Sequence, residues 1–545
     1  MPIMIDSDFI GGAIEDVQFI DSDLISFKAP LDGCERGLWF YFRIRGAQGK
    51  TLTFLQKGMD RVLGVFESGT YEKVQPLVKD GKGAEWRRIP KENTKFTVDP
   101  LEFRFTVTPA ENETFIAFSY PYVLENFESF LKMHATQYIK RETLGKTNEG
   151  RDFPFVIVGD EGGSRDKKLL VFVARHHAGE VSGSYVLEGI LETALSETAA
   201  GKEIRKNYVL AVFPMADLDG VEEGRYGKDR PPVDFNRDWC YKPYHNEIRL
   251  MQRKIAELAT RYEYVFFADL HSPQPGGASY LLPARKAFMG QSQWEDYYGL
   301  VHRFEHRVEN IARCRMIDLD PESLNWSQYN YQYNSIIYNA IKYGVLSVSL
   351  ETSYNLDGNG KLLSPVEWRE MGRNLIESVA EQLDLNAAVE AEKYIPGRIY
   401  EEILWRDWEP VTIPRSVSIE ETIDCISFTA DKDDGEAWVT RRVYYEAEKC
   451  MGDVKLLFDY NFGEKAQAEI IEYFYKDGDV LGHFVSTNVL LETGSYEWTP
   501  YINKKEEVTH CRISIKVKGL KGKLSIKVVD TSLIRKSERN EMIIA

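Results

Sequence analysis

The chain has 545 residues, more than one hydrophobic core normally supports, so its length indicates several domains. Its 85 acidic residues outnumber the 68 basic ones, and the formal net charge of -17 argues against nucleic acid or an anionic membrane as the main partner. No apolar run reaches the roughly 18 to 20 residues that a membrane-spanning helix needs.

The N-terminus lacks the basic and apolar regions of a signal peptide. The six cysteines are scattered without a CxxC pair, which indicates free thiols. We therefore expect a cytoplasmic protein, and a protein whose signal peptide had been removed would show the same features. The sequence does not indicate an oligomeric state.

Residues 1–122 form short alternating segments such as "LWFYFRIRG" and "FRFTVTP", separated by Gly, Pro and Asp. This pattern predicts an N-terminal β-domain. Residues 123–390 change to apolar runs, "LLVFVA", "YVLAVF", "YVFFADL" and "VLSVSL", interleaved with helical stretches. Continuous apolar strands between helices predict an α/β domain with a central, mostly parallel or mixed sheet and helices on both faces.

Pro396 and Gly397 interrupt the chain, and alternation returns in "VTRRVYYEA" and "AEIIEYFY". Residues 396–545 are therefore expected to form a C-terminal β-domain of unknown role. The predicted fold class is α/β, flanked by N-terminal and C-terminal β-sandwich-type domains.

Chemically capable side chains follow the ends of the central strands. In a parallel sheet these ends meet at one edge, where active sites collect. "LLVFVA" leads into "RHHAGE" with His177 and Glu180, "YVFFADL" ends at His271, and "VLSVSL" ends at Glu351. Two His and one Glu with an open fourth position are the ligands of a catalytic zinc, and Glu351 is then available as a base for its water. The HxxE spacing selects His177, which makes His176 a neighbour.

A Gly- and Pro-rich loop after "YVLAVF" carries Arg225, Lys228, Arg230 and Arg237. Alone, such a loop is a solvated basic surface. Beside a zinc site, its cations are suited to an anionic substrate group and to the oxyanion that develops during hydrolysis.

Four motifs occur in the order found in the zinc carboxypeptidase (funnelin) family: "HAGE" at 177–180, "NRDW" at 236–239, "LHSP" at 270–273 and "LETSY" at 350–354. The N-terminal segments "FESGTYEKVQPL", "EWRRIP" and "IAFSYPY" resemble the β-domain of its cytosolic carboxypeptidase-like branch. The chain is similar to this family from about residue 8 to 388. The C-terminal domain lies outside the resemblance.

The resemblance implies a zinc-dependent metallocarboxypeptidase that removes the C-terminal residue of a peptide or protein. Zn²⁺ would be held by His177, Glu180 and His271, and Glu351 would be general base and proton shuttle for zinc-activated water. Asn236 and Arg237 would bind the substrate's C-terminal carboxylate, and Asp234 would orient the first zinc His. These site residues are His177, Glu180, Asp234, Asn236, Arg237, His271 and Glu351.

Two of the family's residues have several candidates here. Arg230 is our choice for the cation that polarises the carbonyl, with Arg225 and Lys228 as alternatives. The family's mobile Tyr has three candidates in "SQYNYQYNS", namely Tyr329, Tyr331 and Tyr333.

Two other functions compete with the carboxypeptidase. A zinc amide hydrolase of small N-acyl amino acids shares the HxxE and distant His pattern, and a catalytically degenerate binding protein would use its β-domains. The β-domains and "NRDW" favour peptides, and the intact ligand set disfavours a degenerate site. The residue that is cleaved is not determined by the sequence.

Overall fold

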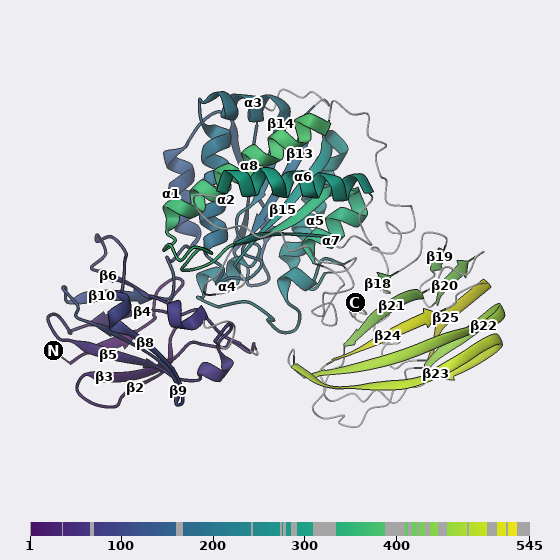
Figure 1. Ribbon diagram of the computed structural model, residues 1–545, viewed down its shortest axis with the longest axis horizontal. Helices are drawn as coiled ribbons and strands as arrows, with labels where there is room; N and C mark the ends of the chain where they lie inside the picture. Colours follow the sequence, from purple (N-terminus) through teal and green to yellow (C-terminus); the bar gives the residue numbers. More distant parts are fainter. Residues whose placement is uncertain are drawn as a thin grey trace.

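Figure 1 shows the computed structural model, in which three groups of strands follow one another along the chain. The structure describes residues 2–34, 36–65, 70–159, 167–240, 243–272, 275, 279–284, 291–308 and 334–386, and the C-terminal strands between residues 409 and 530. Within these residues, no helix has the length and apolar composition required to cross a membrane.

The N-terminal region contains two five-stranded sheets, with strand orders β1-β4-β10-β6-β7 and β2-β3-β5-β9-β8. Their strands and short 3-10 helices are β1 (Met4–Asp6), β2 (Glu15–Phe19), β3 (Leu24–Lys28), β4 (Tyr41–Arg45), β5 (Leu52–Gln56), η1 (Met59–Arg61), η2 (Thr70–Lys73), β6 (Leu77–Asp80), β7 (Arg87–Arg88), η3 (Lys91–Asn93), β8 (Thr94–Val98), β9 (Leu101–Val107) and β10 (Glu113–Ala117). Buried aromatic rings make up much of the core: the ring centroids of Phe27 and Phe40, and of Phe54 and Phe105, lie 5.3 Å apart. Alternating apolar residues thus place one face of each sheet in a shared aromatic core.

The central region holds a seven-stranded mixed sheet of order β11-β12-β14-β13-β15-β17-β16. Its strands are β11 (Ile139–Lys146), β12 (Asp152–Val158), β13 (Lys168–Ala174), β14 (Tyr208–Phe213), β15 (Glu263–His271), β16 (Tyr280–Pro283) and β17 (Leu346–Glu351). The four middle strands are parallel, and β11, β12 and β16 run antiparallel to their neighbours. The middle strands are buried almost throughout, as their continuous apolar sequences predict.

Helices cover both faces of this sheet (Figure 1). From β13 the chain steps to β14 on one side and then returns to β15 on the other side, so right-handed crossovers place α2 and α5 on opposite faces. The helices are α1 (Leu124–Met133), α2 (Ser182–Leu195), α3 (Ala199–Asn207), α4 (Leu218–Glu222), α5 (Asn246–Arg261), α6 (Gln291–Val308), α7 (Ser335–Tyr343) and α8 (Pro365–Asn386).

The C-terminal strands form an antiparallel sheet of order β18-β21-β24-β22-β25-β20-β19, and β23 pairs with β22. They are β18 (Glu409–Thr412), β19 (Val417–Glu421), β20 (Cys425–Ala430), β21 (Glu436–Tyr444), β22 (Lys455–Lys476), β23 (Asp479–Trp498), β24 (His510–Lys518) and β25 (Gly522–Asp530). The long β22 pairs with β25 along its first part and with β24 along its second part.

The predicted α/β class and the N-terminal β-domain are confirmed. The C-terminal strands belong to one sheet, so the sandwich predicted there stays a prediction. The boundary predicted at residues 122 and 123 stays a prediction. The boundary predicted between residues 390 and 396 lies outside the described residues.

Helices α2 and α8 approach each other closely because each has a glycine at their crossing. A Cβ added to Gly189 would lie 1.9 Å from the backbone oxygen of Arg369, and one added to Gly372 would lie 2.0 Å from that of Val186. Neither site has room for a methyl group. Because α2 begins directly after the turn that carries His177 and Glu180, its packing against α8 helps to fix the position of that turn.

We expect Gly189→Ala to lower the free energy of unfolding by about 1–3 kcal/mol, since overpacking at a backbone contact outweighs the higher helix propensity of alanine. Gly83→Ala is the matched control, because a Cβ at Gly83 meets nothing within 4 Å. Differential scanning calorimetry of both variants checks this. Equal melting temperatures of the Gly189→Ala and Gly83→Ala variants would show that α2 and α8 accommodate the added methyl group without loss of stability.

Candidate metal centre and active site

Three strand ends bring the predicted site residues together at one edge of the central sheet. Strand β13 ends at Ala174 and leads into the turn with His177 and Glu180, while β15 ends at His271. Glu351 ends β17 and lies directly opposite His271 in the parallel ladder. This is the edge where parallel α/β sheets collect reactive groups.

The predicted ligands form one buried cluster. His177 Nδ1 lies 2.9 Å from Glu180 Oε1, and His271 Nδ1 lies 2.7 Å from Glu180 Oε2. One ligand atom of each residue lies within 4.8 Å of the others, and His177, Glu180 and His271 are only 4%, 0% and 3% exposed. Two imidazole nitrogens and one carboxylate that converge in this way suit a zinc ion with an open coordination position.

A second carboxylate supports each histidine from behind. His177 Nε2 lies 3.0 Å from Asp234 Oδ2, and His271 Nε2 lies 2.8 Å from Asp269 Oδ2. Such partners orient a histidine so that its other nitrogen faces the metal. Asp234 was predicted from the sequence, whereas Asp269 was missed. Its only signal was a charged residue inside the apolar run "YVFFADL".

Electrostatics in this cluster favour a bound cation. Burial by itself would lower the pKa of His177, but Asp234 and Glu180 outweigh it and raise this pKa to about 9. Asp269 and Glu180 similarly raise the pKa of His271 well above its ordinary value against the effect of burial. Burial opposes ionisation of Glu180, yet the two imidazoles hold its pKa well below its ordinary value. The carboxylates therefore attract positive charge to this point.

His176 lies beside the ligand cluster and could form a second group of metal-capable side chains with Asp269 and His271. Its Nε2 accepts a hydrogen bond from Trp239 Nε1 at 2.9 Å, and its Nδ1 donates to Asp269 Oδ1 at 2.8 Å. Burial lowers the pKa of His176, although Asp269 opposes this shift. His176 and His271 thus share Asp269, but both nitrogens of His176 are engaged.

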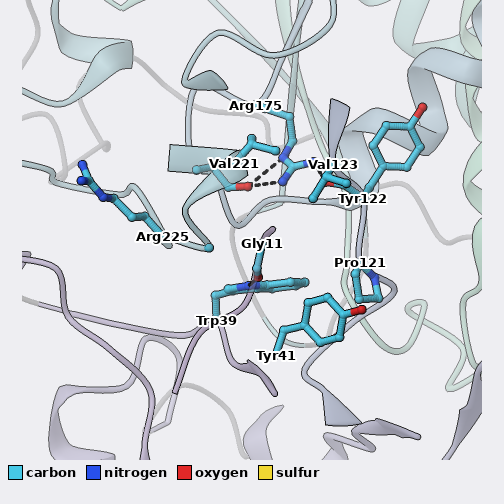
Figure 2. Close-up of a pocket in the computed structure, with 11 residues that line it drawn as sticks. Gly11, Trp39, Tyr41, Pro121, Tyr122, Val123, Arg175, Val221 and Arg225 are labelled. Atoms are coloured by element: carbon cyan, nitrogen blue, oxygen red, sulfur yellow. Dashed lines mark hydrogen bonds between the residues drawn. The ribbon is translucent and has the colours of Figure 1, made fainter. Parts of the chain in front are cut away.

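Arg175 holds the turn that carries His177 and Glu180, the first two ligand candidates. Its backbone has a φ of 63°, and its buried guanidinium donates from Nε and Nη2 to the backbone oxygen of Ala178. Nη1 reaches the oxygen of Tyr122 at 3.0 Å. Figure 2 shows Arg175 at a pocket whose opposite wall carries Trp39 and Tyr41 of the N-terminal region. The turn is thereby tied to Tyr122 in the segment between β10 and α1.

The cations of the Gly- and Pro-rich loop differ in their partners. Lys228 Nζ lies 3.8 Å from Glu180 Oε1, inside the cluster. Arg230 Nη1 instead donates to the buried Asp217 at 2.7 Å, and Arg225 pairs with Glu223. The structure therefore places Lys228 nearest to the ligands and commits Arg230 to a carboxylate.

Asn236 and Arg237 form part of a short 3-10 helix, η4 (Phe235–Arg237). Asn236 Oδ1 accepts a hydrogen bond from the backbone of Ser335 at 2.9 Å, and its Nδ2 lies 2.9 Å from His271 Nε2. Asn236 thus connects α7 to a metal-ligand candidate. Arg237 is half-buried and donates from Nη1 to the oxygen of Asn236 at 2.9 Å.

The three candidates for a mobile tyrosine, Tyr329, Tyr331 and Tyr333, lie outside the described residues. Glu351 lies within them and is half-buried. Burial raises the pKa of Glu351, His271 and Lys228 counteract this shift, and Glu180 adds to it. The carboxyl group of Glu351 is therefore disposed to hold a proton.

Comparison with known proteins agrees with this geometry. Residues 5–121 match the cytosolic carboxypeptidase N-terminal domain, and residues 125–274 match the zinc carboxypeptidase family. Cytosolic carboxypeptidase 6 of Mus musculus is 24% identical over 49% of this chain, a match that spans about half of the relative (53%). The Homo sapiens protein of that name is 23% identical over 70% of this chain and 78% of its own length.

Solved structures share the fold. The metallo-carboxypeptidase from Burkholderia cenocepacia has a TM-score of 0.61 at 18% identity, covering 71% of this chain and 100% of its own. The metallo-carboxypeptidase from Pseudomonas aeruginosa has a TM-score of 0.59 at 19% identity, covering 70% of this chain and 99% of its own. With the site geometry, the two domain matches confirm the resemblance: residues 125–274 match the zinc carboxypeptidase family, and residues 5–121 match the N-terminal domain of cytosolic carboxypeptidases.

Proposed function

We propose that the protein is a zinc-dependent metallocarboxypeptidase that hydrolyses the C-terminal residue of a peptide or protein. The observation that carries this proposal is the convergence of His177, Glu180 and His271 at adjacent strand ends, with Glu351 opposite His271. The names of the relatives support a peptide substrate and a cytosolic location. We extend both to this chain.

His177, Glu180 and His271 would hold the metal. When bound, zinc supplies a Lewis acid that polarises a carbonyl and lowers the pKa of water. Asp234 and Asp269 would keep the two imidazoles oriented, because each lies against the nitrogen that faces away from Glu180. Burial of the cluster excludes bulk water, which strengthens every charge interaction in it.

Glu351 is our candidate for the general base. Its position beside His271 places a carboxylate at the metal cluster without making it a ligand, and burial keeps its proton affinity high. It would take a proton from the attacking water at a carboxylate oxygen and deliver that proton to the leaving amine. A base with a raised pKa is suited to both steps.

Two cations have separate tasks in this proposal. Arg237 would bind the terminal carboxylate of the substrate, a group that a guanidinium holds with two hydrogen bonds. For the oxyanion, the contacts favour Lys228 over our sequence-based choice, Arg230. Lys228 adjoins Glu180, whereas Arg230 neutralises the buried Asp217. Removal of Arg230 would leave the buried Asp217 without its ion-pair partner. Arg230 therefore has a structural role.

Purified protein should contain about one zinc ion per chain, because three protein ligands plus an open position complete a catalytic site. His177→Ala and His271→Ala should each lower zinc content severalfold in a zinc-buffered dialysis, measured by inductively coupled plasma mass spectrometry. His134→Ala, a half-buried histidine at the end of α1, is the control. Full zinc content in both ligand variants would exclude this cluster as the metal site.

Arg237→Ala should lower kcat/KM for peptides with a free C-terminus by about 10- to 100-fold, the cost of a lost charge-assisted hydrogen bond of roughly 1.5–3 kcal/mol. Amidated versions of the same peptides provide the control. They should be poor substrates of the native protein, and Arg237→Ala should affect them little. Equal cleavage of free and amidated peptides by the native protein would favour an endopeptidase or a deacylase.

Glu351→Gln keeps the shape of the side chain but removes the proton acceptor. We expect turnover to fall by a factor on the order of 100 to 10,000, the usual contribution of a positioned base, while zinc content and melting temperature stay at native values. All three quantities are measured on one preparation. Native turnover in a stable, zinc-loaded variant contradicts the assigned role. Loss of zinc together with stability would indicate a structural carboxylate instead.

A further inference from the structure

One side chain of the N-terminal region reaches the segment that follows Glu351. Arg88 Nη1 donates to Asn355 Oδ1 at 2.6 Å, and its Nη2 donates to the backbone oxygens of Leu363 at 2.8 Å and Tyr354 at 3.1 Å. Nη1 also donates to the oxygen of Gln75 at 3.0 Å. A single guanidinium therefore fastens the segment 354–363 to the N-terminal β-domain.

The partners of Arg88 are unusual for a charged group. All four acceptors are neutral oxygens, and within the described part of the chain Arg88 forms no ion pair. The guanidinium carbon lies 5.5 Å from the ring centroid of Tyr120, a cation–π contact. Burial lowers the pKa of Arg88 to about 10, so it still carries its charge at neutral pH. Electrostatic attraction to Glu367 opposes this shift, and the planar guanidinium offers several donors to the four neutral oxygens.

Residues 352–355 form hydrogen bonds with backbone oxygens at and beside the metal-ligand candidates. Thr352, the residue after Glu351, donates from its backbone to the oxygen of His271 at 2.8 Å. The hydroxyl of Tyr354 donates to the oxygen of Gly179, between the first two ligand candidates, at 3.4 Å. Asn355 Nδ2 donates to the oxygen of Pro275 at 2.7 Å.

We propose that Arg88 is a positioning residue for catalysis: from the N-terminal domain it holds the segment after Glu351, and so fixes where the Glu351 carboxylate stands relative to the ligand cluster. This inference rests on the proposed carboxypeptidase function. It makes the N-terminal β-domain a structural part of the active site. A misplacement of about 1 Å in a catalytic group can cost on the order of 100-fold in rate, so a clamp three residues from the base has a large effect on turnover.

The guanidinium fork is what the clamp requires. It directs two nitrogens toward three acceptors in the segment, and a lysine ammonium is a single point that cannot reach all of them in the same geometry. Removal of the fork would leave these oxygens without their donor, and the segment would relax toward other partners.

The neighbouring residue offers a matched control. Arg87 also belongs to β7, but its side chain is exposed and pairs with Asp80 of the same sheet at 2.8 Å. We expect Arg88→Ala to lower kcat per zinc-loaded chain by about 10- to 100-fold with KM changed less than about threefold. Arg87→Ala should match the native protein, and Arg88→Lys should recover part of the loss. Guanidinium at millimolar concentration, but not methylammonium, should partly restore Arg88→Ala.

Hydrogen–deuterium exchange provides a readout that does not depend on activity. Peptides covering residues 352–363 should exchange faster in Arg88→Ala than in Arg87→Ala or the native protein. Native kcat and native exchange in Arg88→Ala would overturn the proposal. An equal effect of Arg87→Ala, or a loss of activity that follows the loss of zinc or of folded protein, would overturn it as well.

The two proposals fail in different ways. If the native protein cleaves no peptide with a free C-terminus, the proposed function is wrong, and the exchange of residues 352–363 alone then decides whether Arg88 holds the segment. If the native protein is active and Arg88→Ala equals it in both measurements, only the positioning role is wrong. Should Arg88→Ala not fold, Arg88→Lys against Arg87→Lys provides the same comparison.

Discussion

The buried carboxylate of Glu180 is the group on which the rest of the site depends. It contacts both His177 and His271, and these histidines in turn contact Asp234 and Asp269. Three buried carboxylates thus surround two imidazoles, and burial without compensating positive charge would be strongly unfavourable. In the absence of a metal, the histidines respond by raising their pKa values. A divalent cation would neutralise the three carboxylates while the imidazoles stay uncharged. This accounts for three buried carboxylates at one edge of the sheet.

The mixed sheet makes this concentration of charge possible. Its parallel middle strands are buried on both faces and end together, so each strand can deliver one polar group from an apolar interior. The ladder sets His271 opposite Glu351, and the crossing of α2 and α8 at two glycines holds the helix that follows the HAGE turn. The end of β15 thus carries His271, the turn directly after β13 carries His177 and Glu180, and the following loops carry the cations.

Two arginines, the buried Arg175 and the half-buried Arg88, hold the backbone around the candidate site. Arg175 donates to the HAGE turn and to Tyr122, which lies between β10 and α1, and Arg88 donates to the segment after Glu351. In both arginines, one planar guanidinium donates hydrogen bonds to several backbone oxygens, which its fixed arrangement of N–H groups allows. The N-terminal domain is thus part of the framework around the metal cluster, which gives a physical reason for its presence ahead of the catalytic domain.

The sequence by itself determined the α/β class and the order of the strand ends, and it proposed His177, Glu180 and His271 as a ligand set, because hydrophobic periodicity reports burial and the HxxE spacing is local. The HxxE spacing favoured His177 over His176 as a ligand, and this choice stays a prediction. Only the tertiary structure decided that Asp269 supports His271, that Arg230 is committed to Asp217 while Lys228 adjoins Glu180, and that Arg88 reaches Tyr354, 266 positions away. These pairings depend on strand register and on the paths of loops. Periodicity carries no information about either, since the partner of a buried charge is chosen by position in space and not by distance along the chain.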